Sequence, residues 1–327
     1  MDHLALFVLG LVLLAVGAPL LVFGAARLDR ATGRTPFAVG LVAVCFGPCV
    51  AGLAFDLAMV LRTPPATKVA VGHIVGSTIA SVGLVLGAAA LARPITATAK
   101  LFHTLIPLAV AAPILLWFVA RDAPDAPLSQ VGGVVLLAAC AGAVALLVRA
   151  ARQEPQTVKA EFASWVPERT PVWVAVVLAL GGIAALVGGA RLTTAEVIGT
   201  AAHLKAPWFV LSSTLAAGVT ALPTAVVAVV AARRGRSEIV LGLVAGSVLC
   251  NALVAAGASA LARPLEIERR VILEMIPVMA LFAVLLLATR FNGLKVRRWE
   301  GALLLAAYIG FTAWQVSIAL QVARPAK

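Results

Sequence analysis

The sequence is poor in charged residues, and acidic residues are the scarcest. Only 12% of its 327 residues are charged, Asp and Glu together number 14, and 62% of the residues are hydrophobic. A soluble domain carries about a quarter charged residues, so the composition excludes an ordinary soluble protein. Apolar runs long enough to cross a bilayer recur, for example 4–26 and 206–232. We therefore predict an all-α multi-pass membrane protein surrounded by lipid, and no nucleic-acid partner despite the net charge of +12.

No long polar stretch interrupts these runs, apart from 149–170, so no soluble domain is expected. The basic residues fall mostly in short loops, where they set orientation. Loop 233–236, "RRGR", is expected inside and loop 121–125, "RDAPD", outside, which places both termini outside. We expect an integral protein of a bacterial cytoplasmic membrane. Its ten predicted spans are 4–26, 37–61, 69–92, 101–120, 127–148, 171–190, 207–232, 239–262, 271–289 and 301–323.

The chemistry of common enzymes and metal centres is also missing. The chain contains no G-x-S-x-G elbow and no H-E-x-x-H motif, so we predict no enzyme and no cofactor. Four cysteines fall inside spans without metal-ligand spacing, and we interpret them as small apolar packing residues with no metal site. These are Cys45, Cys49, Cys140 and Cys250.

An internal repeat is the strongest positive signal. Segment 71–95, "VGHIVGSTIASVGLVLGAAALARPI", aligns with segment 241–265, "LGLVAGSVLCNALVAAGASALARPL", at an offset of 170. Upstream, 35–53 aligns with 206–224 at an offset near 171. Five spans separate the copies, and an odd number inverts the second copy relative to the first. We predict two inverted five-helix repeats: 1–150 with its motif in spans 2 and 3, a cytoplasmic linker at 151–170, and 171–327 with its motif in spans 7 and 8.

Inverted repeats are typical of secondary transporters, whose substrate site lies near the membrane midplane between the repeats. The repeat spans also contain helix breakers, Gly47 and Pro48 in span 2 and Gly218 and Pro223 in span 7. A proline inside a span frees a backbone carbonyl that needs a partner, and lining a hydrated cavity supplies one. Ordinary kinks between packed helices are the alternative. The matching positions favour a site.

At these residues the chain resembles the calcium/cation antiporter superfamily, the sodium/calcium exchangers and their relatives. That family carries two inverted motifs reading roughly G-T-S-x-P-E and then G-N-x-x-G-S-N/D-x-x-N. In the second copy "VTALPT" (219–224) and "GLVAGSVLCN" (242–251) take these places. In the first copy "GPCVAG" (47–52) and "GHIVGSTIAS" (72–81) do so. The resemblance implies a ten-span exchanger fold and ion exchange.

The departures from the motif fall on its chemistry. The family's two motif glutamates would stand at Thr224 and at Gly52, or at Leu53 or Ala54 if the gap is placed differently. Calcium prefers several carboxylate oxygens, so a monovalent cation or a proton is favoured over calcium as the small-ion substrate. Mostly neutral oxygens remain at the motif positions. The candidate ion-binding residues are Gly52, Asp56, His73, Ser77, Thr78, Ser81, Thr220, Thr224, Ser247 and Asn251.

Asp56 is the one carboxylate inside the repeat spans, four residues after Gly52 and thus on the same helix face. His73 opens the neighbouring span, so the two side chains could pair, and such a pair could carry a proton. We expect Asp56 to carry the coupling charge. The alternatives are an aspartate at the interface, beside the loop at 62–68 or tied to Arg62, and a histidine that is only hydrogen-bonded near the interface.

Two readings of the function follow. The first is an exchanger-like secondary transporter with altered, non-calcium ion coupling. The second is a degenerate protein that keeps the exchanger fold without transport. An intramembrane protease is disfavoured because it needs two facing carboxylates, and only Asp56 lies deep enough in a span.

Overall fold

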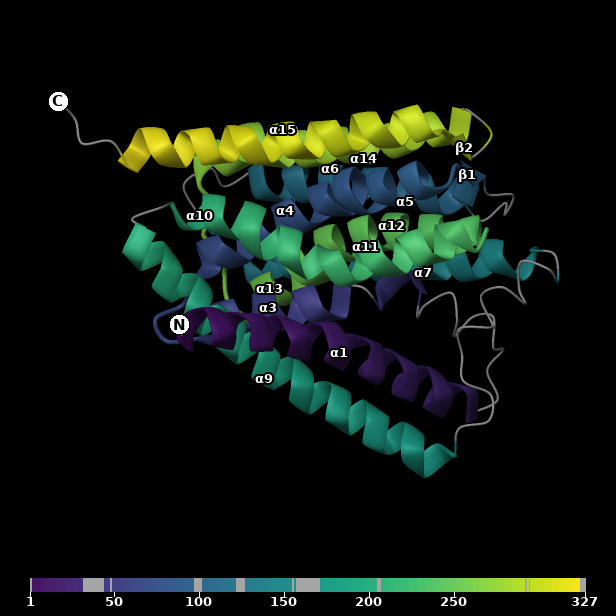
Figure 1. Cartoon of the computed structure of the whole chain (residues 1–327), viewed down its shortest axis with the longest axis horizontal. Helices are drawn as coiled ribbons and strands as arrows, with labels where there is room; N and C mark the ends of the chain where they lie inside the picture. The colour runs from purple at the N-terminus through teal and green to yellow at the C-terminus, as the bar shows by residue number, and fades with distance from the viewer. Residues whose placement is uncertain are drawn as a thin grey trace.

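The computed structural model describes residues 2–31, 44–47, 49–96, 102–121, 127–154, 156, 171–204, 207–291, 293 and 295–323. Nearly all of this is helix, and most helices run side by side along one direction (Figure 1). The predicted all-α fold is confirmed. The predicted linker lies almost wholly outside the described residues, so the boundaries at 150 and 171 remain predictions.

The first half contains six labelled helices, one π-helical segment and a two-residue strand. They are α1 (Asp2–Ala31), α3 (Cys49–Leu61), α4 (Thr67–Ala80), η1 (Ser81–Leu86), α5 (Gly87–Ala92), β1 (Ile95–Thr96), α6 (Phe102–Arg121) and α7 (Gln130–Arg152). The second half follows the same plan. Its elements are α9 (Val172–Leu204), α10 (Trp208–Leu211), η2 (Ser212–Ala216), α11 (Ala217–Arg233), α12 (Ser237–Cys250), η3 (Asn251–Ala255), α13 (Ala256–Ala262), η4 (Val271–Met275), α14 (Ile276–Phe291), β2 (Lys295–Val296) and α15 (Arg298–Ala323).

The predicted spans appear as apolar helices. Among the described residues, seven helical stretches are long and apolar enough to cross a membrane. The other three predicted spans hold shorter apolar helices, Ala5–Leu21, Cys49–Leu61 and Val271–Leu287. In spans 3 and 8 the helix passes through a π-helical segment, η1 and η3, before it continues as α5 and α13.

Contacts between the halves repeat with the offset found in the sequence. Ile95 pairs with Val296 in the small antiparallel sheet, and Leu265 forms an isolated bridge with Leu128. Ile95 and Leu265 are 170 residues apart, and Leu128 and Val296 are 168 apart. The chain that follows α5 thus pairs with the chain that precedes α15. In the same way, the chain that follows α13 pairs with the chain that precedes α7. The inverted repeat is a property of the fold.

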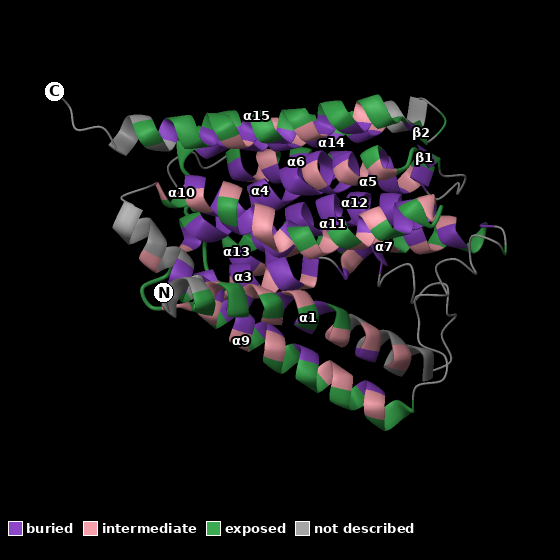
Figure 2. Cartoon of the chain, in the orientation of Figure 1, coloured by how far each residue is buried: buried purple, intermediate pink, exposed green. Residues whose placement is uncertain are grey.

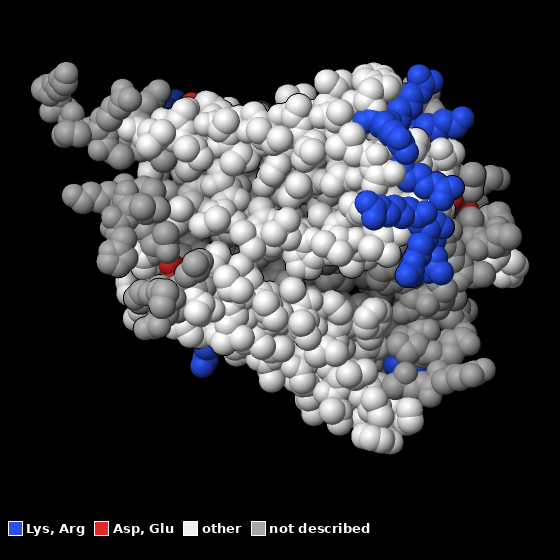
Figure 3. Space-filling model, viewed as in Figure 1, with Lys and Arg blue, Asp and Glu red and all other residues white. Residues whose placement is uncertain are grey.

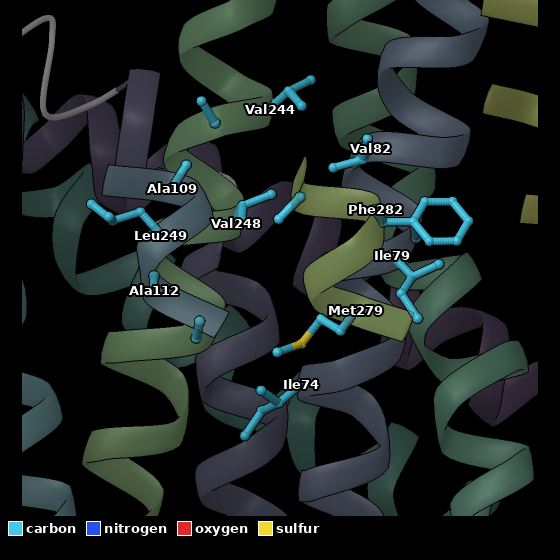
Figure 4. Close-up of a cluster of buried hydrophobic side chains, with 14 of the residues drawn as sticks. Ile74, Ile79, Val82, Ala109, Ala112, Val244, Val248, Leu249, Met279 and Phe282 are labelled. Carbon is cyan, nitrogen blue, oxygen red and sulfur yellow. The ribbon is translucent and has the colours of Figure 1, made fainter. Parts of the chain in front are cut away.

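Spans 3 and 8 form the centre of the molecule and are its most deeply buried helices (Figure 2). Around them, α6 and α14 complete an apolar core in which Ile79, Val248 and Met279 pack together (Figure 4). Glycines allow the closest approaches. A Cβ atom on Gly76 would overlap the backbone of Ser213, and one on the equivalent Gly246 would overlap the backbone of Cys45. Each central span is therefore pressed against the start of the kinked span of the other half.

Helices α1 and α9 form a separate antiparallel pair along one side of this core (Figure 1). Their backbones are in contact where Gly10 meets Gly189 and where Gly17 meets Gly182. Basic side chains gather at one end of the molecule (Figure 3). There Arg93 donates to the backbone oxygen of Arg233 at 3.1 Å, and β1 pairs with β2 beside Arg297. The loops that carry Arg93, Arg233 and Arg297 thus share one end.

We expect opposite effects from the same substitution at two glycines. Gly142, on α7, faces open space, and a Cβ atom added to it would meet no heavy atom within 4 Å. Gly142→Ala should therefore gain roughly 0.5–1 kcal/mol from reduced backbone freedom. Gly246→Ala forces apart α12 and the start of span 2 and should cost about 1–3 kcal/mol. Thermal unfolding of the purified protein in detergent measures both. Equal shifts in the two variants would contradict the close contact at Gly246.

Candidate functional site

A small polar cavity lies at the centre of the molecule, between α3, span 3, α11 and span 8. Its volume is about 30 Å³. A cavity of roughly 10–15 Å³ holds one water molecule, so this one has room for a single small ion with little hydration. It is lined by Cys49, Gly52, His73, Ser77, Ser81, Val85, Thr220, Ala221, Thr224, Ser247 and Asn251.

All the residues predicted for the site line this cavity except Asp56 and Thr78. Thr78 is fully buried, and its hydroxyl donates to the backbone oxygen of Ile74 at 2.9 Å. Asp56 lies behind His73 rather than on the cavity wall. The motif did not indicate Cys49, Val85 or Ala221 as lining residues. Val85 lies four residues after Ser81, so helical periodicity was the signal available for it.

A hydrogen-bonded chain crosses from one half to the other through His73. Its Nδ1 atom lies 2.8 Å from Asp56 Oδ1, and its Nε2 atom lies 2.9 Å from Thr220 Oγ1. The side chains of His73 and Asp56 are each 1% exposed. The predicted pairing of these residues is confirmed. Asp56 is the least exposed of the buried carboxylates among the described residues, and the imidazole of His73 lies between it and the cavity.

The protons of this chain can be placed from its acceptors. The Thr220 hydroxyl lies 2.9 Å from the backbone oxygen of Ala216 and donates to it. Its oxygen is then free to accept from Nε2–H of His73 in the tautomer that carries a proton there. A further proton shared between Nδ1 and the Asp56 carboxyl gives either a neutral pair or an imidazolium beside a carboxylate. Both forms have no net charge, and loss of that proton leaves one negative charge beside the cavity.

The hydroxyl groups on the cavity wall present acceptors to its interior. Ser77 donates to the backbone oxygen of Ile74 at 3.2 Å, and Ser81 donates to the backbone oxygen of Ser77 at 2.8 Å. A hydroxyl has one proton and two lone pairs, so once the proton is used on the helix backbone, only lone pairs remain for a guest. Ser247 is 3% exposed and its hydroxyl has no hydrogen-bond partner among the described residues. This polarity suits a cation.

The cavity wall is partly symmetric. Ser77 and Ser247 are equivalent at the offset of 170, and so are Ser81 and Asn251, which begin the π-helical segments η1 and η3. Segments of this kind occur frequently at functional sites. The symmetry ends at His73, whose equivalent is Leu243. The titratable pair therefore belongs to the first half alone.

The prediction that all four cysteines are apolar packing residues is wrong for two of them. Cys49 and Cys250 form a disulfide, with Cα atoms 6.5 Å apart and a sequence separation of 201. This Cα separation lies within the usual range for disulfides. The inverted fold brings the start of α3 and the end of α12 together, a proximity that spacing along the chain does not reveal. Cys45 and Cys140 are buried and free.

Comparison with known proteins identifies the family to which this architecture belongs. Residues 3–149 and 174–317 match the model of the sodium/calcium exchanger protein family. The chain belongs to this family. Over 312 residues this exchanger-family chain is 28% identical to the putative antiporter CaxA of Alkalimonas amylolytica, covering 94% of this chain and 96% of CaxA. Over 340 residues it is 28% identical to the sodium/calcium exchanger MaX1 of Methanosarcina acetivorans, covering 94% and 96%.

The solved structures agree with the sequence comparison. A structure of the sodium–calcium exchanger NCX_Mj, soaked with Na⁺ and Sr²⁺, superposes with a TM-score of 0.64 at 28% identity and covers 95% of this chain and 97% of that one. The exchanger-family chain is thus an integral multi-pass membrane protein with the fold of a cation antiporter. Its relatives are transporters and not enzymes, as the sequence predicted.

The disulfide predicts a definite number of reactive thiols. Unfolding in detergent with N-ethylmaleimide and no reductant should label two of the four cysteines, Cys45 and Cys140. Prior reduction should give four adducts, and Cys250→Ser should give three without reduction because Cys49 is released. Intact mass spectrometry counts the adducts. Four adducts in the unreduced wild-type protein would show that the Cys49–Cys250 bond does not form.

Proposed function

We propose that this chain is an antiporter that exchanges protons for a monovalent cation. The observation that carries the proposal is the cavity wall: hydroxyl oxygens turn lone pairs inward beside one proton-sharing pair, His73 and Asp56. The hydroxyls of Ser77 and Ser81 offer a guest only lone pairs, because their protons are used on the helix backbone, and this favours a cation. The neighbouring pair supplies the negative charge that a monovalent cation needs.

Calcium is disfavoured as a substrate for two reasons. It takes six to eight oxygen ligands, usually with several carboxylates among them, and no carboxylate lines the cavity within the described residues. A divalent ion held only by neutral dipoles keeps much of its desolvation cost at mid-membrane. A single monovalent cation neutralises the one negative charge of the deprotonated His73–Asp56 pair. The names of the relatives CaxA and MaX1 support cation exchange in general, and the ligands of this chain support the narrower choice.

The coupling follows from competition for one charge. With a proton on the His73–Asp56 pair, the pair is neutral and the cavity has little attraction for a cation. When the proton leaves, the pair carries one negative charge and a cation enters among Ser77, Ser247 and Asn251. Proton and cation therefore each lower the affinity for the other, as linkage requires. Exchange of one for one moves no net charge.

The basic residues indicate how the protein is oriented in the membrane. We place the end that carries Arg93, Arg233 and Arg297 in the cytoplasm of a bacterial cell, because cytoplasmic loops are enriched in Lys and Arg. Both termini then lie outside. The two halves, 1–150 and 171–327, are joined on the cytoplasmic side by the linker 151–170.

The proposal predicts cation-driven proton movement. Proteoliposomes that contain a pH-sensitive dye should become alkaline inside when Na⁺, K⁺ or Li⁺ is added outside, and Ca²⁺ at equal ionic strength should have no effect. Because a proton competes with the cation, the apparent KM should rise by up to about tenfold for each pH unit of acidification. Asp56→Asn should abolish the exchange.

A matched carboxyl variant controls this test. Glu274 lies on η4, its side chain is 47% exposed, and it pairs with Arg270 at 3.0 Å, so Glu274→Gln should leave exchange unchanged. Saturable Ca²⁺ uptake, or unchanged proton movement in Asp56→Asn, would refute the proposed coupling. Folded protein that moves none of these ions would favour the other reading, an exchanger fold without transport.

The unpartnered hydroxyl of Ser247 predicts a second effect on the same assay. Removing one ligand oxygen costs about 1 kcal/mol, so Ser247→Ala should raise the apparent KM for the cation roughly fivefold. Thr78→Ala removes a hydroxyl of equal depth that does not face the cavity, and its KM should match the wild type. An equal change in both variants would indicate a general loss of stability instead.

A further inference from the structure

A second, larger cavity lies beside the polar one, between α1 and α11. Its volume is about 290 Å³. The two cavities share Thr220 and Thr224 as a common wall. The lining comes from α1, the residues around the start of α3, α11 and α12, and it includes Ala15, Val219, Pro223, Val227 and Leu243.

The chemistry of this cavity is apolar. Apart from the two shared threonines, no side chain on its wall can form a hydrogen bond, and none is charged. A water molecule in a cavity needs two to four polar partners, and apolar cavities of this size stay dry and bind apolar guests. An empty cavity would leave its lining atoms without dispersion contacts. An apolar guest is therefore the occupant that the wall favours.

The internal repeat explains why the cavity exists. Asp56 and His73 correspond, at offsets of 171 and 170, to Val227 and Leu243, and both of these line the apolar cavity. The space that holds the proton-sharing pair in the first half is thus matched in the second half by a hollow with an aliphatic wall.

Exposed apolar residues on α1 and α11 border this cavity. On α1, Val12 and Val16 are each 50% exposed, and on α11 Leu222 and Val226 are 50% and 62% exposed. These residues border the lining residues Ala15, Pro223 and Val227 along the same helices. The surface of α1 and α11 between the two ends of the molecule carries no Lys, Arg, Asp or Glu among the described residues (Figure 3). The cavity lining is thus continuous with the lipid-facing surface.

We propose that this cavity is a lipid site that holds one acyl chain of a bilayer phospholipid. The chain enters between α1 and α11 and ends against Thr220 and Thr224. It packs on the far side of the wall of the polar cavity and keeps water from reaching that wall from the membrane side. The proposal is independent of which ion the protein carries.

The test uses a phosphatidylcholine that carries a photoreactive diazirine near the end of one acyl chain. The wild-type protein is reconstituted with this lipid and irradiated, and the labelled residues are mapped by mass spectrometry. We expect labelling at Val219, Pro223 and Val227, which line the cavity, in addition to the exposed Leu222 and Val226. Ala15→Phe fills the cavity and should remove the first set of labels while the second set remains.

Val12→Phe is the matched control, because it adds the same ring to the lipid-facing side of α1 one turn away, and its labelling pattern should equal that of the wild type. Labels confined to Leu222 and Val226 in every variant would overturn the proposal. So would labelling of Val219 and Pro223 by a water-soluble diazirine, because that result would mean that the cavity is hydrated.

Discussion

No bulk water reaches the centre of a bilayer, so every polar group there needs a partner within the protein. The middle of this protein follows that constraint closely. Hydroxyl groups donate to carbonyls of their own helices, as Ser81 does to Ser77, and the buried carboxyl of Asp56 is paired with an imidazole. The exception at the cavity is Ser247, whose hydroxyl has no partner within the described residues. A polar group left open in such surroundings marks the place where a guest is expected.

The inverted repeat determines how the central helices are arranged. Residues that differ between its two copies determine the chemistry at the centre. Spans 3 and 8 cross the kinked spans of the opposite half through similar glycine contacts, Gly76 with Ser213 and Gly246 with Cys45. One difference between the two halves changes the chemistry of the centre. His73 and Asp56 make one side of the centre titratable, whereas Leu243 and Val227 make the other side apolar. A polar cavity and a dry one are thus neighbours across two threonines.

Much of the fold was predictable from the sequence, because span length, apolar composition and a fixed repeat offset can be read directly from the order of the residues. The ten spans and the inversion followed from them, and most of the cavity wall followed from the resemblance to the exchanger motifs. Thr78 was predicted for the site but does not line the cavity, because its hydroxyl turns toward the backbone oxygen of Ile74. A motif gives the position of a residue along a helix and not the direction of its side chain. The disulfide was missed because Cys49 and Cys250 occupy non-equivalent places in the two repeats. Only the folded arrangement of α3 and α12 brings them together.

The bond between Cys49 and Cys250 also limits how the centre of the protein can rearrange. A disulfide keeps its two Cα atoms within about 7 Å of each other, and this one joins the halves at Cys49, which lines the polar cavity. A movement that opens the cavity to an ion must therefore keep the start of α3 and the end of α12 together. At this point one side-chain bridge connects the two halves covalently, although the two cysteines have a sequence separation of 201.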